Sequence, residues 1–169
     1  PITYDYAMRE RCHVNCWPLT RPFAEAELYK RQLDEAIAKA DNGWHPRFAL
    51  MRHACVYDNE SDREQALAAI RRLLSQFENL FRNAGDVVNG FPAPLSLDEI
   101  EGREQYDPLM LEENLMFGNP DTIITKLKRY EALGVNEFIY YASMGLDHAA
   151  QQRSLRMFCD EVMPEFKEG

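Results

Sequence analysis

The chain lacks the long apolar segment that a membrane-spanning helix requires. No run of about 18 uncharged apolar residues occurs, and the N-terminus has no basic segment followed by an apolar one. Basic residues are in the minority, because 19 Lys and Arg face 28 Asp and Glu, which gives a formal charge of −9. This acidic balance argues against binding to nucleic acid or to an anionic membrane surface. We therefore expect a soluble, cytoplasmic protein.

Cysteine is also scarce, and a disulfide framework is not predicted. The four cysteines lie mainly in apolar runs, where free thiols are usually buried: Cys12, Cys16, Cys55 and Cys159. The first two flank His13, which suggests a metal site. In a strand, however, positions i and i+4 stand roughly 13 Å apart, too far for one ion. Buried strand thiols are the favoured interpretation, and zinc is the alternative.

Several well-known active-site motifs are missing. The sequence contains no glycine-rich dinucleotide fingerprint, no P-loop, no nucleophile elbow and no His-Glu-x-x-His motif. The functions that depend on those motifs are therefore not indicated.

The clearest pattern that is present lies in the last third of the chain. Asn119 and Pro120 are typical of the start of a helix, and Gly134 is typical of its end. The apolar, aromatic run 138–142 then predicts a strand buried on both faces. A closing helix is predicted with an inward stripe of Leu155, Phe158, Cys159 and Val162. Helix, strand and helix in this order are typical of a parallel α/β protein.

The rest of the chain repeats this alternation. We predict a helix from Thr3, as N-cap, to about Arg9, with Tyr6 and Ala7 turned inward. Two further helices are expected at 23–40 and from Ser61, which opens a capping box, to 83–85. The second of these should turn four residues inward: Ile70, Leu74, Phe77 and Phe81. Parallel strands are predicted near 12–17, 48–56 and 137–142, three in all.

The stretch at about 85–116 is the least regular part of the sequence. It contains Gly90, Pro92 and Pro94, and it predicts only short helices at 96–103 and 108–114. A connection of this length is unusual in an α/β protein, and such segments often serve as lids or binding loops. We expect a lid-like insertion, and a surface insertion without a role is the alternative.

Several of these motifs together resemble the luciferase-like flavin monooxygenases, the family of the bacterial luciferase α subunit. The similarity is carried by Gly118-Asn119-Pro120-Asp121, by Leu133-Gly134-Val135 and by the terminal 158–164 run, and it continues over most of residues 1–169. It implies one domain that is the C-terminal half of a (β/α)8 TIM barrel. The first half, whether truncated or naturally absent, would precede Pro1. The open strand edges therefore predict a covering partner, either the missing half or a second copy.

In a parallel barrel the active site gathers at the carboxyl ends of the strands. The residues predicted there are aromatic and mildly polar, which suits a flat conjugated ligand: Asn15, Trp17, His53, Tyr57, Tyr141, Ser143 and Met144. Ordinary core packing is the alternative for the aromatic members. His53 is a candidate for proton transfer because its pKa lies near neutrality, with a structural histidine as the alternative.

The resemblance implies roles for three further positions. It places Thr3 on a flavin phosphate at a helix N-terminus, Tyr4 beside it, and Trp17 near the flavin ring. The Glu-Ser pair that completes the phosphate site in the family would precede Pro1. Thr3 as a simple cap and Trp17 as a plug of the barrel mouth are the alternatives.

The function that the resemblance implies is monooxygenation with reduced FMN and O2. One oxygen atom would pass to a small organic substrate, and a separate flavin reductase would supply the reduced cofactor, so no Rossmann domain is needed. This fragment alone is expected to be inactive. A hydride-transferring enzyme that uses the deazaflavin F420 is the first alternative, and a non-catalytic flavin-binding or assembly subunit is the second.

Overall fold

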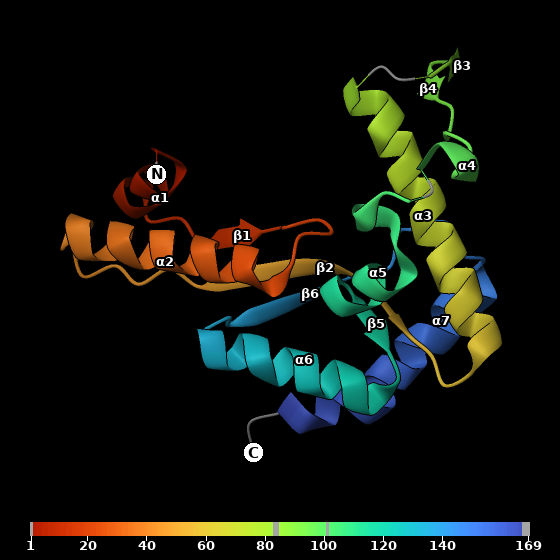
Figure 1. Cartoon of the computed structure of the whole chain (residues 1–169). Helices are drawn as coiled ribbons and strands as arrows, with labels where there is room; N and C mark the ends of the chain where they lie inside the picture. The colour runs from red at the N-terminus through yellow and green to blue at the C-terminus, as the bar shows by residue number, and fades with distance from the viewer. Residues whose placement is uncertain (1, 83–84, 101, 167–169) are drawn as a thin grey trace.

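A parallel sheet lies at the centre of the computed structural model, which describes residues 2–82, 85–100 and 102–166. The sheet contains β1 (Val14–Cys16), β2 (Phe48–Val56), β5 (Met116–Gly118) and β6 (Glu137–Tyr141). β2 is the central strand, since each of the other three pairs with it in parallel. Figure 1 shows β2 running through the middle of the molecule between the helices.

Helices separate the strands along the chain. They are α1 (Ile2–Glu10), α2 (Phe23–Ala40), α3 (Glu60–Arg82), α6 (Pro120–Leu133) and α7 (His148–Met157). After α7 the chain continues as a π-helix (Phe158–Val162) and a 3-10 turn (Met163–Phe166). In α6 the Asn119 side chain accepts a hydrogen bond from the Thr122 amide, and Gly134 ends the helix at φ 94°, both as predicted. The alternation of helices with parallel strands confirms the predicted α/β fold class.

The sheet has one strand more than the sequence predicted. β5 is only three residues long, and it pairs Met116, Phe117 and Gly118 with Ala54, Cys55 and Val56 at the carboxyl end of β2. A strand this short shows no usable periodicity, so it was missed.

The segment at 85–116 folds against α3. It forms a hairpin of β3 (Val87–Val88) and β4 (Phe91–Pro92), then α4 (Leu97–Ile100), a 3-10 turn (Glu104–Tyr106) and α5 (Pro108–Asn114). The amide group of Asn79 on α3 donates to the carbonyls of Asp86 and Ala93 at 2.8 and 2.9 Å. Figure 1 shows the hairpin at the end of α3 that lies far from the sheet. Both short helices fall inside the ranges predicted for them.

β2 separates two apolar clusters. Phe48, Leu50, Ala54 and Val56 belong to a cluster with the inner faces of α2 and α6. Cys55 and Tyr57 belong to a second cluster with α3, α5 and Phe117. β2 is therefore buried on both sides. The prediction of burial on both faces for the run 138–142 is wrong, because β6 has no buried residue and Ile139 is 36% exposed.

Some predicted details of the helices are wrong. α3 begins one residue before Ser61, so Asn59 is its cap, and the Asn59 side chain accepts from the Asp62 amide at 2.9 Å. Phe81 is 76% exposed because α3 continues beyond the sheet, although Ile70 is fully buried. The predicted end of this helix at 83–85 lies partly outside the described residues.

The first and last helices also differ from the prediction. α1 begins at Ile2, so Thr3 lies within its first turn rather than at its N-cap. Tyr6 is exposed, whereas Ala7 is buried as predicted. In the closing segment Phe158 and Val162 are buried, but Leu155 and Cys159 are exposed. The π-helix accounts for this difference, because it changes the helical period within the predicted stripe.

All four cysteines are free, and two of them lie in the core. Cys16 and Cys55 are buried, but Cys12 precedes β1 and is exposed, contrary to the prediction of a buried strand thiol. No helix in the described part of the chain has the length and apolar character needed to span a membrane.

Candidate functional site

Three rings from three neighbouring segments form a cluster next to the carboxyl ends of the strands. Trp17 directly follows β1, His53 lies on β2, and Tyr141 ends β6 opposite His53 in the sheet register. The rings of His53 and Tyr141 stack with centroids 4.5 Å apart. Trp17 contacts both rings edge-on, at 5.4 Å from Tyr141 and 5.8 Å from His53. The structure therefore brings together three of the residues that the sequence placed at the barrel mouth.

Three buried nitrogen atoms of this ring cluster have no hydrogen-bonding partner in the part of the chain that the structure describes. His53 is 1% exposed, and within the described residues neither of its ring nitrogens nor the Trp17 Nε1 atom has a partner. Burial lowers the pKa of His53 to about 4, so the ring is neutral at physiological pH and offers one donor and one acceptor. Buried polar groups are nearly always paired in folded proteins. The three nitrogen atoms are therefore buried hydrogen-bonding groups that the described residues leave unpaired.

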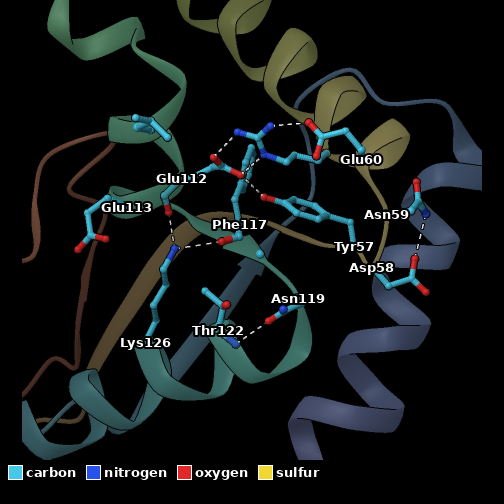
Figure 2. Close-up of a pocket in the computed structure, with 13 residues that line it drawn as sticks. Tyr57, Asp58, Asn59, Glu60, Glu112, Glu113, Phe117, Asn119, Thr122 and Lys126 are labelled. Carbon is cyan, nitrogen blue, oxygen red and sulfur yellow. Dashed lines mark hydrogen bonds and ion pairs between the residues drawn. The ribbon is translucent and has the colours of Figure 1, made fainter.

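A second feature is a cavity of about 470 Å³ at the carboxyl ends of β2 and β5, shown in Figure 2. Its walls come from the β2–α3 connection, from α5 and from the start of α6. Gly118 is the last residue of β5 and has φ +148°, and a Cβ at this position would lie 2.8 Å from Thr122 Cγ2. The close approach of α6 to β5 therefore requires glycine here.

Glu112 on α5 is the centre of a charged network in this cavity. Its Oε1 atom accepts from Tyr57 Oη and from Arg63 Nε, each at 2.6 Å, and its Oε2 atom accepts from Arg63 Nη2 at 2.7 Å. Arg63 also pairs with Glu60 at 2.6 Å. The hydrogen bonds from Arg63 hold the pKa of Glu112 below its usual range. This Glu112 network ties the last helix of the 85–116 segment to α3 and to the end of β2.

Lys126 on α6 stabilises the same region through hydrogen bonds to the backbone. Its ammonium group donates to the backbone carbonyls of Glu112, Leu115 and Phe117, as Figure 2 shows in part. Burial lowers the pKa of Lys126 to about 8. The lysine satisfies carbonyl groups at the end of α5 that have no helical partner, and so it joins α5 and β5 to α6.

The structure places the two predicted residues of α1 apart from the ring cluster. Thr3 is exposed in the first turn of α1. Tyr4 is half-buried and packs against the apolar cluster that contains Cys16. Burial, with a smaller contribution from Cys16 and Tyr29, raises the pKa of Tyr4 to about 12. Trp17 and His53 contact each other, whereas Tyr4 packs against the apolar cluster formed by Cys16 and residues of α2.

Sequence reasoning missed the Glu112 network and the role of Lys126. Lys126 occupies an inward position of the α6 stripe, three residues after Ile123 and directly before Leu127. A lysine on an apolar face indicates a buried polar contact, and this signal was available. Nothing local distinguishes Glu112 from Glu113 in the sequence.

Comparison with known proteins shows what the chain is similar to. No family model matches it. Over all 169 residues it is 30% identical to the oxygenase component of the flavin-dependent trigonelline monooxygenase of Acinetobacter baylyi, covering 100% of this chain and 47% of that protein. Over its whole length the chain is therefore similar to part of a flavin-dependent monooxygenase component. The chain spans about half the length of the curated relative that it matches.

Solved structures share the fold of this chain. Monooxygenase RslO1 from Streptomyces bottropensis superposes with a TM-score of 0.65 at 14% identity, over 99% of this chain and 46% of its own. An F420-dependent secondary alcohol dehydrogenase, solved with an F420-acetone adduct, gives a TM-score of 0.59 at 15% identity over 99% of this chain and 47% of its own. The parallel sheet of this chain thus corresponds in fold to part of a (β/α)8 barrel.

Proposed function

We propose that this chain is the C-terminal part of the barrel of an FMN-dependent monooxygenase. The whole protein would use reduced FMN and O2 to oxygenate a small organic substrate. The observation that carries the proposal is the ring cluster of Trp17, His53 and Tyr141 with its unpartnered buried polar atoms at the strand ends. The named relative supports the flavin, and its family supports the reaction class.

The residues present fit a flavin. A flavin ring system is flat and carries both donors and acceptors along one edge, and the ring cluster offers aromatic faces, two N–H donors and one acceptor. We place Trp17 beside the ring, with His53 hydrogen-bonded to its polar edge. Thr3, with its exposed hydroxyl in the first turn of α1, would hold the flavin phosphate, with Tyr4 beside it.

The chemistry belongs to the cofactor, and the chain supplies its surroundings. A bound reduced flavin gives two electrons to O2, so that one oxygen atom enters the substrate and the other leaves as water. The faces of Trp17 and Tyr141 exclude water from the ring. Because His53 is neutral, it holds one proton at one ring nitrogen and can donate that hydrogen to a ligand acceptor.

The proposal includes partners that complete the protein. Strands from outside this chain, in a preceding half-barrel or a second copy, would cover the open sheet edges, and the chain by itself would be inactive. The relative is named as an oxygenase component, which supports a separate flavin reductase as the source of reduced FMN. We also propose that the 85–116 segment acts as a lid through α5, which borders the cavity at the carboxyl ends of β2 and β5. Free thiols at all four cysteines fit a cytoplasmic location.

Turnover by the protein that contains this chain tests the proposed function. The protein is supplied with FMN, a flavin reductase and NADH, and O2 uptake coupled to product is followed with candidate substrates by mass spectrometry. We expect one oxygen atom from labelled O2 in the product. Flavin binding without any O2-dependent product would favour the non-catalytic alternative. Binding of F420 in preference to FMN, measured by visible absorbance, would favour the hydride-transfer alternative, whose fold is the same.

A further inference from the structure

Arg52 lies directly before His53 on β2 but faces the opposite side of the sheet. Its side chain is fully buried. Nη1 donates to the carbonyl oxygens of Leu19 and Arg21 at 2.9 and 2.8 Å, and Nη2 donates to Tyr130 Oη on α6 at 2.9 Å. The guanidinium group therefore joins the β1–α2 connection to α6.

No acid in the described ranges balances the charge of Arg52. Among the described residues its hydrogen-bonding partners are two backbone carbonyls and a phenol, and no ion pair involves it. A second buried cation, Lys126, is close enough for Arg52 to contribute to the lowering of its pKa. A buried cation without an acidic partner is costly, and apolar packing would fill the same space at lower cost. The position thus has a requirement beyond packing.

The connection that Arg52 holds is a strained turn. Leu19 has φ 51°, a left-handed conformation that is unfavourable for leucine. The Arg21 amide donates to the Pro18 carbonyl at 2.8 Å and closes the turn. Both carbonyls bound by Arg52 belong to this turn. The hydrogen bonds from Arg52 therefore keep the turn in a conformation that its own sequence disfavours.

Trp17 immediately precedes this turn. Its Nε1 atom has no hydrogen-bonding partner among the described residues, so only ring contacts and the backbone fix the indole. A change in the turn would move the indole relative to His53 and Tyr141. Arg52 thus acts on the backbone next to Trp17 from one face of the sheet, while the indole ring packs on the opposite face.

We propose that Arg52 is a positioning residue, which holds Trp17 in the ring cluster through the Leu19 and Arg21 carbonyls. Its relevance to flavin binding rests on the proposed function. Two adjacent residues of β2 then serve one site from opposite faces. His53 lines the ring cluster, and Arg52 places the indole that completes it.

Fluorine NMR tests this proposal on the protein that contains this chain. Tryptophan is replaced by 5-fluorotryptophan, and the Trp17 resonance is assigned by its loss in Trp17→Phe. We expect Arg52→Met to shift and broaden the Trp17 resonance and to leave the Trp44 resonance unchanged. The dissociation constant for FMN should rise at least tenfold.

Tyr130→Phe is the matched control. It removes only the phenol that Arg52 Nη2 contacts, and the two bonds to the turn remain. We expect its Trp17 resonance to be unchanged and its affinity for FMN to stay within twofold. Arg52→Lys is the second variant in case Arg52→Met does not fold, because it keeps the cation but loses the planar fork, and it should also displace the resonance.

An unchanged Trp17 resonance in a folded Arg52 variant would overturn the proposal, and so would an equal shift in Tyr130→Phe. The NMR comparison requires no flavin. If the parent protein binds no FMN, the proposed function fails, but the resonances still decide the role of Arg52.

Discussion

At the scale of single residues, His53 links the stability of the fold to pH. Burial lowers its pKa from 6.5 to about 4. Between these two pH values His53 is therefore protonated in the unfolded state but neutral in the folded state. The free energy of unfolding should therefore fall as the pH drops from 6.5 to about 4. The loss is on the order of 3 kcal/mol.

His53→Phe is the variant that isolates this effect, because phenylalanine keeps a ring against Tyr141 but has no proton to gain. We expect denaturant unfolding to show a smaller loss of stability over this pH window in the variant than in the parent. Equal losses would mean that His53 does not titrate in the way that its burial indicates.

Gly118 is the second residue for which we predict the size of a change in the free energy of unfolding. Its φ of +148° and the 2.8 Å approach of Thr122 both oppose a side chain. Gly118→Ala should lower the free energy of unfolding by roughly 2–4 kcal/mol, since backbone strain and a steric clash add.

Gly43→Ala is the matched control, because Gly43 has φ +71° but no atom within 4 Å of the place that a Cβ would occupy. This substitution should lower the free energy of unfolding only by the backbone strain, which is about 1 kcal/mol. Thermal or denaturant unfolding measures both values, and equal costs would show that the contact with Thr122 relaxes freely.

At the scale of elements, the Glu112 network decides how firmly α5 is held. Glu112→Gln keeps the shape of the side chain but removes the charge that Arg63 binds in two places. Hydrogen exchange of the α5 amides should become faster in this variant. Glu113→Gln changes an exposed neighbour, so its exchange should match the parent.

Acid should have a similar effect on α5. The pKa of Glu112 is depressed in the folded state, so its contribution to stability is present at neutral pH and is lost as the pH falls through that depressed value.

For the two variants, faster hydrogen exchange of the α5 amides in Glu113→Gln than in Glu112→Gln would contradict the account of the network.

The long elements were predictable from sequence, and the contacts between them were not. The helix predicted at 23–40 matches α2, and Asn119 and Gly134 mark α6 as predicted, because caps and periodicity act over a few neighbouring residues. β5 was missed because three residues carry no period. The Glu112 network was missed because Tyr57 and Glu112 are 55 residues apart and meet only through the fold.

The candidate site divides in the same way. Trp17, His53 and Tyr141 were predicted at the strand ends because a parallel sheet collects those ends on one side. Two facts follow only from the packing of side chains: the His53 ring nitrogens and Trp17 Nε1 lack partners among the described residues, and Arg52 binds the β1–α2 turn.

At the scale of the whole molecule, the chain corresponds to about half of each protein that it resembles. β2 pairs with three parallel strands, while the matched relative and both solved structures are about twice as long. The flavin site that we propose is therefore one wall of a pocket. Its ring cluster is in place, and the remaining walls would come from other strands.

Anaerobic calorimetric titration with reduced FMN tests this account most directly. It compares the protein that contains this chain with its Trp17→Ala and Trp44→Ala variants. Trp44 is a matched control because it stacks on His13 at 5.2 Å, outside the ring cluster. The account predicts that reduced FMN binds the parent and Trp44→Ala equally and binds Trp17→Ala at least tenfold more weakly. Equal binding by all three proteins, or no binding by the parent, would contradict it.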